Sequence, residues 1–382
     1  MSTNSICQGQ QVPILWPLIF KTGHEIAFAH TSFKWANLAS HNAGVTVVIV
    51  GISNETETER KIYSINDSDE SLVKQVNSIN AYLVAGTNII VEKRPSPHDG
   101  RMLVEAGGKP VDGGNLLISS NEALKLIQKY SAINKFIKRA YGSSEFIRGD
   151  VRYCIWVADE DISEASKTAD FARRFSAVAA LRRNSPKAAT QKGAIYPHRF
   201  EEVKQRGDEE IIIVPKVSSE SRDYLPVGLL AAGSIITDLA FALYDAPLWN
   251  MALIASRLHL VWIATVCGKL KTDFRYSNTL GWNTFPVPTL TEQNKTDLTR
   301  CAEDILLARE HYFPATIADM YDPDRMDREF PLVREAHDRN DEVLERIYIG
   351  RRFKNDTERL EKLFELYTKM TQTAPQKTAK GK

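Results

Sequence analysis

Long hydrophobic runs are missing from this chain of 382 residues. No apolar stretch reaches the roughly 20 residues that a membrane-spanning helix needs. The first apolar run, Val12 to Phe20, follows a polar start and contains Pro13 and Pro17, unlike the uninterrupted core of a signal peptide. We therefore expect neither a membrane span nor secretion, and we predict a soluble cytoplasmic protein.

Closely paired cysteines and an excess of one charge are missing as well. The 49 basic and 48 acidic residues leave a formal net charge of +1, so only the local distribution of charge can indicate a nucleic-acid partner. With 43% hydrophobic residues, the chain can bury more than one core. The cysteines are too scattered for a zinc site or a redox motif, which predicts reduced, structural thiols at Cys7, Cys154, Cys267 and Cys301.

A basic stretch departs from this balance. Between Phe171 and Arg199 there are seven basic residues and no aspartate or glutamate. The seven are Arg173, Arg174, Arg182, Arg183, Lys187, Lys192 and Arg199. Such side chains can contact DNA phosphates and fix the register on a duplex without recognising its sequence. A solvated helix face followed by a loop explains these residues equally well.

A predicted hairpin carries exposed aromatic residues. Val45 to Val50 is almost entirely β-branched, as in a buried strand, and Glu25 to Ala29 offers it a neighbour. Between them we expect a loop with Phe33, Lys34 and Trp35. One of the two rings could stack on a nucleobase while the cation holds a phosphate. The alternative is that the rings plug the end of the sheet.

A series of short motifs along the chain resembles one family. The motifs are Thr3-Asn4-Ser5-Ile6-Cys7-Gln8-Gly9, Pro110-Val111-Asp112-Gly113-Gly114-Asn115-Leu116-Leu117, Phe146-Ile147-Arg148-Gly149 followed by Arg152-Tyr153, Val217-Ser218-Ser219-Glu220-Ser221-Arg222-Asp223-Tyr224-Leu225-Pro226, His259 with Trp262, Arg275-Tyr276-Ser277-Asn278 and Asn283-Thr284-Phe285-Pro286-Val287-Pro288. In this order they resemble the carboxy-terminal portion of the MmeI-like (type IIL) restriction-modification enzymes, which are adenine-specific DNA methyltransferases.

The resemblance implies a fold in three parts. We expect an α/β part of a Rossmann-like, S-adenosylmethionine-dependent methyltransferase sheet, then a mixed α+β target recognition domain, then an α-helical carboxy-terminal domain. The expected boundaries are 1–125 for the methyltransferase part, 126–142 for a linking helix that begins near Asn121 and runs to about Ala140, 143–288 for target recognition, 289–371 for the helical domain and 372–382 for a disordered tail.

The resemblance also implies what this chain does not contain. The family's glycine-containing cofactor loop and its catalytic Asn-Pro-Pro-Tyr motif occur nowhere in these residues. The motif's carbonyl groups accept hydrogens from the adenine amino group, whose lone pair is otherwise delocalised, so we assign no catalytic residue. We expect a carboxy-terminal portion whose S-adenosylmethionine site is incomplete and which needs an upstream half, supplied separately or lost. No nuclease cluster or metal site is expected.

The resemblance assigns roles to further polar residues. In the stretch Gly268 to Ser277, Lys271 and Asp273 occupy the place of a residue pair that recognises one base pair, and in one extended strand they would point the same way. Lysine donating to guanine and aspartate accepting from cytosine would suit a G·C pair; an exposed salt bridge is the alternative. Arg222 and Arg275 are candidate phosphate contacts, whereas His259 and Trp262 fit the core better.

Two other functions remain open from the sequence. The chain could be a non-catalytic DNA-binding specificity module, which would bind a preferred sequence alone. It could also be a truncated gene remnant, whose product would lack a cooperative unfolding transition. Double-stranded DNA is the expected partner of the methyltransferase portion and of the specificity module.

Overall fold

The computed structural model describes residues 1–35, 45–54, 59–65, 70–270 and 273–372. The chain packs as two compact units. The first unit consists of 1–101, 256–295 and 341–382, and the second consists of 102–255 and 296–340. These units are defined by packing, whereas the expected domain boundaries follow family segments, so those boundaries stay a prediction.

The first unit is built on a five-stranded sheet in the order β1-β3-β2-β4-β5. Its elements are β1 (Ser2–Thr3), α1 (Val12–Phe20), β2 (Glu25–Trp35), β3 (Val45–Ser53), β4 (Arg60–Ile65), β5 (Ser71–Val76), α8 (Arg257–Val266), β15 (Lys269–Leu270), β16 (Asp273–Arg275) and α13 (Asp356–Gln372). Neighbouring strands are antiparallel, except that β2 and β4 are parallel.

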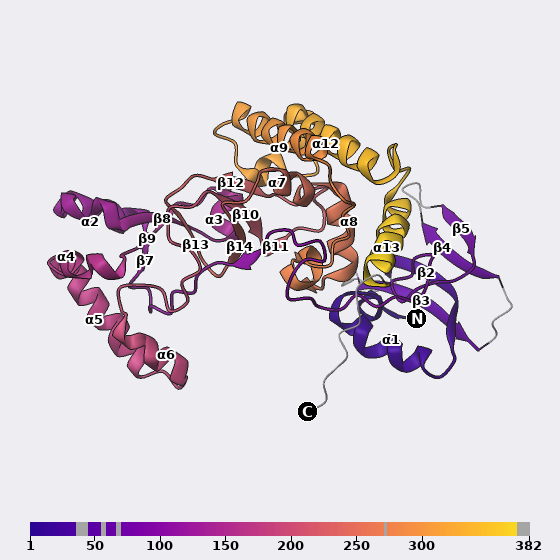
Figure 1. Cartoon of the computed structure of the whole chain (residues 1–382), viewed down its shortest axis with the longest axis horizontal. Helices are drawn as coiled ribbons and strands as arrows, with labels where there is room; N and C mark the ends of the chain where they lie inside the picture. The colour runs from indigo at the N-terminus through magenta and orange to yellow at the C-terminus, as the bar shows by residue number, and fades with distance from the viewer. Residues whose placement is uncertain (36–44, 55–58, 66–69, 271–272, 373–382) are drawn as a thin grey trace, which may run out of the picture. The chain divides into compact units, whose positions relative to one another are not determined.

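The core of the first unit joins one face of this sheet to helices from distant parts of the sequence. Ile26, Ala29 and Val48 are buried in the sheet. Helix α8 packs beside α13 (Figure 1), and the ring of Trp262 lies 5.2 Å from that of Phe364. The predicted strand near Val47 is therefore confirmed, but only Val47 and Val48 of β3 are buried, so the burial expected of the whole β-branched run is not found.

The expected loop at Phe33 is wrong. Strand β2 continues to Trp35, and its register with β3 pairs Phe33 with Val47 and Trp35 with Val45. An irregularity between His30 and Phe33 lets the strand resume after a shift of register. The backbone groups of this aromatic segment are thereby satisfied by the sheet.

The second unit contains two four-stranded sheets, in the orders β12-β10-β14-β6 and β13-β8-β9-β7. Its elements are β6 (Glu105–Ala106), β7 (Leu117–Ser119), α2 (Ser120–Lys129), β8 (Ile137–Tyr141), α3 (Ser143–Arg148), β9 (Arg152–Ile155), α4 (Ile162–Ala165), α5 (Ala169–Arg183), α6 (Ala188–Lys192), β10 (Ile211–Pro215), β11 (Val217–Ser218), β12 (Gly228–Leu230), β13 (Ser234–Ile236), β14 (Ala240–Tyr244), α7 (Trp249–Ile254), α10 (Ile317–Met320) and α11 (Met326–Glu329). All five residues of β10 are buried, and β10 lies between β12 and β14 in its sheet.

The linking helix predicted from Asn121 to Ala140 is correct only in its first half. Helix α2 ends at Lys129, a short 3-10 turn follows, and Ile137 begins strand β8. Ile137 pairs with Ile155 of β9 and is buried. The apolar residues continue at helical spacing beyond Lys129, but pairing with β9 places Ile137 in a strand, so tertiary packing overrides the local pattern.

The carboxy-terminal segment is helical, as expected. Helices α9 (Glu292–His311), α12 (Pro331–Ile349) and α13 account for most of it. Helix α13 continues to Gln372, one residue into the predicted tail, and 373–382 lie outside the described residues. No helix in the described ranges is long and apolar enough to cross a membrane. All four cysteines are buried and free of disulfide bonds.

Candidate nucleic-acid interface

Two members of the basic stretch are structural, which corrects their expected role as phosphate contacts. Arg182 is fully buried, and its five N–H groups donate to five backbone carbonyls at 2.7–3.1 Å. Arg174 is 6% exposed, donates to the carbonyl of Asn115 at 3.0 Å and pairs with Glu122. Neither guanidinium can reach a phosphate, because its donors are directed into the protein.

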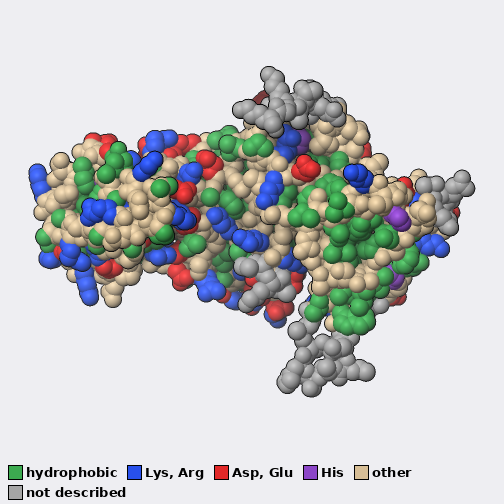
Figure 2. Space-filling view, turned by 90° about the horizontal axis from the view of Figure 1, so that it is seen from below, with side chains coloured by type: hydrophobic (Ala, Val, Ile, Leu, Met, Phe, Trp, Pro, Cys, Tyr) green, Lys and Arg blue, Asp and Glu red, His purple; other side chains and the backbone are tan. Residues whose placement is uncertain are grey.

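The other cations of the stretch lie at the surface. Four cations are exposed on or beside α5 and α6, namely Arg173, Arg183, Lys187 and Lys192. Figure 2 shows several Lys and Arg side chains over the part of the second unit that holds these helices. Arg199 is partly held, since it donates to Asp159 at 2.8 Å and its guanidinium carbon lies 4.0 Å from the ring centre of Tyr196. Four exposed cations therefore remain available to an anionic partner, although Arg173 also lies 3.7 Å from the carboxylate of Asp170.

The segment from Gly268 to Ser277 forms a hairpin instead of one extended strand. Strands β15 and β16 are antiparallel, and Leu270 pairs with Asp273. Lys271 lies outside the described residues. Asp273 is half-buried, Arg275 is exposed, and Phe274 between them is buried. The expected common direction of Lys271 and Asp273 therefore stays a prediction, whereas Asp273 and Arg275 share a face of β16.

Arg222 is a weaker candidate for DNA contact than the exposed cations. Its side chain is half-buried, and its guanidinium donates to the hydroxyl of Ser218 at 3.3 Å. Ser218 ends the short strand β11, so the bond ties Arg222 to its own loop.

The aromatic pair at the end of β2 shares one face of the strand. Phe33 is half-buried and Trp35 is 44% exposed, while Lys34 between them is exposed. Residues that are two apart on a strand point the same way, so both rings lie on one face and the ammonium group on the other. Residues 36–44, which follow them, lie outside the described part of the chain.

His259 and Trp262 belong to the core, as the sequence predicts. Both are completely buried. His259 Nε2 lies 3.1 Å from the hydroxyl of Tyr276, and the indole of Trp262 donates to Thr284 at 3.2 Å. Burial, reinforced by the charge of Arg101, lowers the pKa of His259 to about 3, so this imidazole is neutral at physiological pH.

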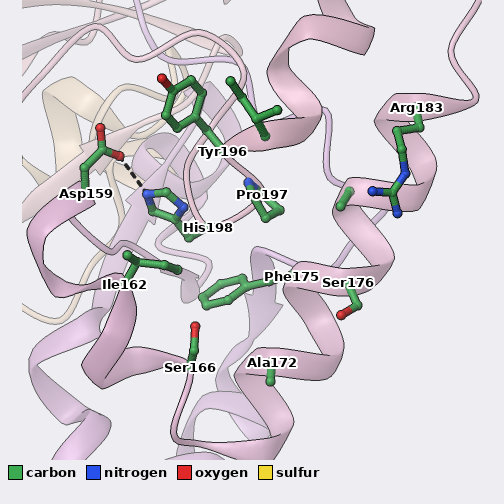
Figure 3. Close-up of a pocket in the computed structure, with 12 residues that line it drawn as sticks. Asp159, Ile162, Ser166, Ala172, Phe175, Ser176, Arg183, Tyr196, Pro197 and His198 are labelled. Carbon is green, nitrogen blue, oxygen red and sulfur yellow. Dashed lines mark hydrogen bonds and ion pairs between the residues drawn. The ribbon is translucent and has the colours of Figure 1, made fainter.

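A pocket in the second unit escaped the sequence analysis. It lies between α4, α5 and the loop around Pro197, with a volume of about 630 Å³ (Figure 3). Asp159 and His198, which are far apart in the sequence, meet there at 2.7 Å. Because these two residues meet only in the folded chain, no local sequence motif marks the pocket. The one local signal for it is the aromatic Tyr196, two residues before His198, which also lines the pocket.

Residues for a metal or cofactor are not apparent. Within the described ranges, no group of three or more His, Cys, Asp or Glu side chains could hold a metal ion. We assign no described residue to S-adenosylmethionine.

The sequence matches three adjoining family models. The model of the MmeI target recognition domain matches residues 85–289, which is more than half of the chain. The chain belongs to the MmeI family. The model of the MmeI DNA-methyltransferase domain matches residues 1–64, and that of the MmeI C-terminal domain matches residues 290–374. The resemblance inferred from the motifs is therefore confirmed.

Two relatives of this MmeI-family chain are close enough to compare. DNA methyltransferase A of Bacillus subtilis (strain 168) is 38% identical over 372 residues, which are 97% of this chain and 41% of that protein. The type IIL restriction-modification enzyme MmeI, solved in complex with DNA, is 33% identical with a TM-score of 0.81 over 97% of this chain and 49% of the MmeI chain. The chain thus spans less than half of either relative, and the likeness supports the mixed fold with a helical carboxy-terminal segment.

Proposed function

We propose that this chain binds double-stranded DNA and recognises part of the target sequence of an adenine-N6 DNA methyltransferase in a restriction-modification system. One observation carries the proposal: the match to the MmeI target recognition domain extends over residues 85–289, and the whole chain resembles MmeI, which was solved bound to DNA. Sequence recognition is the function that a target recognition domain performs for its enzyme.

Contacts to phosphates would position the chain on the duplex, and contacts to bases would recognise the sequence. Arg173, Arg183, Lys187 and Lys192 would contact phosphates, since they are exposed and lie outside the core. At the β15–β16 hairpin, Asp273 would accept a hydrogen bond from the amino group of a cytosine, with Lys271 as its partner in the readout. Arg275 shares the face of Asp273 and would add a phosphate contact there.

Holding the target adenine is proposed for the end of β2. A flipped base needs an aromatic face to stack on, and Phe33 and Trp35 present rings on one side of the strand. Lys34 would face a phosphate. Replacing Phe33 or Trp35 separately with alanine, and measuring affinity for DNA with a mismatched target adenine, identifies the ring that stacks; equal and negligible losses would exclude both.

Methyl transfer is proposed to require a polypeptide that carries the glycine loop and the Asn-Pro-Pro-Tyr motif with S-adenosylmethionine. The surface of the first unit supports such a partner. Ile14 and Leu18 of α1 are 70% and 66% exposed, and Phe28 of β2 and Ile52 of β3 are 41% and 50% exposed. Figure 2 shows hydrophobic side chains gathered where Figure 1 places α1. A neighbouring methyltransferase half would cover this apolar area.

The test begins with binding. The purified chain, shown to unfold cooperatively, is offered a pool of random duplexes, and the bound fraction is sequenced. We expect a preferred sequence whose choice at one base pair changes in Asp273→Ala, while non-specific affinity stays the same. Binding without any sequence preference, or a preference that Asp273→Ala leaves intact, would contradict the assigned readout.

Catalysis is tested separately. We expect no methyl transfer from labelled S-adenosylmethionine to adenine by this chain alone, and transfer once the upstream half of a relative is added. Transfer by the chain alone would contradict the assignment of chemistry to a partner. Sequence-specific binding that no upstream half converts into transfer would identify a non-catalytic specificity module.

A further inference from the structure

The pocket between α4 and α5 is a built cavity. Its volume of about 630 Å³ lies in the range that holds small ligands, roughly 300–1,000 Å³. Ile162 comes from α4, Ala172 and Phe175 come from α5, and Pro197 closes the cavity from the following loop (Figure 3). Phe175 is 4% exposed and forms part of the core, so the apolar floor is fixed before any ligand arrives.

The wall opposite α5 is held in place by two hydrogen bonds to the carboxylate of Asp159. Oδ1 of Asp159 accepts a hydrogen bond from Nε2 of His198 at 2.7 Å, and Oδ2 accepts one from Arg199 at 2.8 Å. The ring of Phe175 meets that of His198 edge-on, with centroids 6.3 Å apart. The negative charge of Asp159 is therefore already neutralised by Arg199, so this carboxylate does little to repel an anionic ligand from the pocket.

The rim of the pocket supplies charge and hydroxyl groups. Arg183 is exposed at the mouth, and in the described part of the chain it has no ion-pair partner. The hydroxyls of Ser166, Ser176 and Tyr196 also line the cavity and likewise have no hydrogen-bond partner among the described residues. No acidic residue occurs between 171 and 199. The one acid of α5, Asp170, lies in the first turn of the helix, whereas Arg183 is its last residue, and Asp170 is already paired with Lys129.

We propose that this pocket binds a nucleotide monophosphate, with its base on the apolar floor and its phosphate at Arg183. A purely aliphatic ligand would leave the guanidinium and three hydroxyls without partners, and a small aromatic acid would use only Arg183. A nucleobase with its sugar offers a flat apolar face for Phe175 and polar edges for the hydroxyls. The nucleotide is either free or an unpaired residue of a DNA strand. This site goes beyond target recognition: it shares Arg183 with the proposed phosphate contacts but uses none of the residues assigned to base readout.

The first arm of the test measures calorimetric titrations with adenosine 5′-monophosphate (AMP), adenosine and inorganic phosphate. We expect saturable binding of AMP, with adenosine about tenfold weaker, which corresponds to about 1.4 kcal/mol. Arg183→Gln should abolish the advantage of AMP over adenosine, and Ser176→Trp should block both by filling the mouth. Lys125→Gln, which removes an exposed cation of α2 outside the pocket, is the control and should leave the affinities for AMP and adenosine unchanged.

The second arm identifies the source of the nucleotide. A duplex with one unpaired terminal nucleotide is compared with the blunt duplex of the same sequence, with AMP as competitor. Tighter binding of the unpaired end, reversed by AMP, identifies a DNA strand; equal binding of both duplexes, with AMP still bound, identifies a free nucleotide. Absence of saturable AMP binding, or equal affinity for AMP and adenosine, overturns the proposal. Target recognition is scored on blunt duplexes with Asp273→Ala, so its failure is distinguishable.

Discussion

Replacing Arg182 with methionine should destabilise the second unit more than any other change in the basic stretch. Its side chain is fully buried, and each of its five N–H groups donates to a backbone carbonyl. The acceptors belong to Pro110, Val111, Gly193, Tyr196 and Arg199. One guanidinium therefore joins the segment before β7 to the segment after α6.

The magnitude follows from the number of acceptors left unpaired. A buried hydrogen bond contributes about 1 kcal/mol net, so the loss of five costs about 5 kcal/mol if water does not reach the carbonyls. Lysine at position 182 has three donors and leaves at least two carbonyls unpaired, which costs about 2 kcal/mol. A domain is stable by only about 5–15 kcal/mol, so the methionine variant should be close to unfolding.

The assay is hydrogen exchange followed by mass spectrometry, together with urea unfolding. Arg182→Met should lose amide protection in peptides covering Pro110–Val111 and Gly193–Arg199, while the first unit keeps its own. Arg183→Met, the exposed neighbour on the same helix, is the matched control and should lie within about 0.5 kcal/mol of the parent chain. Equal stability of the two variants would refute the structural role assigned to Arg182.

Three further predictions concern other residues. His259 has a folded-state pKa of about 3 against an ordinary 6.5. Because the unfolded state binds the proton more tightly, the free energy of unfolding is full above pH 6.5 and falls below it, by about 2 kcal/mol at pH 5. An unchanged urea midpoint from pH 7.5 to pH 5 would contradict this. Arg183→Gln and Lys187→Gln should each lower the slope of log affinity for duplex DNA against log salt by about 1, and an unaltered slope removes that residue from the phosphate contacts. Gly107→Ala should lower the free energy of unfolding by about 1–3 kcal/mol, because its Cβ would meet a backbone carbonyl oxygen at 2.3 Å. Gly268→Ala is the control, since its Cβ would meet nothing within 4 Å. Similar thermal midpoints for both variants would count against the clash.

The sequence indicates strands and helices best where one spacing persists. Strand β3 is recognisable because every residue from Val45 to Val50 is β-branched. The continuation of β2 to Trp35 is not, because the shift of register after His30 breaks the alternation that identifies a strand. The end of α2 is hidden for the opposite reason, since apolar residues continue at helical spacing into a strand.

The sequence also contains a signal that separates buried from exposed cations. Phe171, Arg174, Phe175, Val178 and Arg182 follow the spacing of one helix face, and all five are buried. Counting charges treats Arg182 and Arg183 alike, whereas the helical position of each distinguishes a structural arginine from an exposed one. The Asp159–His198 pair, in contrast, depends on a tertiary contact that no local spacing reports.

The two packing units determine when each part of the chain can complete its core during synthesis. Residues 102–255 and 296–340 form one unit, while the other needs 1–101, 256–295 and 341–382. The unit that begins first on the ribosome is therefore completed last, because α13 lies at Asp356–Gln372. Until that helix emerges, Trp262 lacks Phe364 and Tyr367 as neighbours and the nascent core stays open. A premature stop codon shortly after position 340 would spare every residue of the second unit and leave the first without its closing helix.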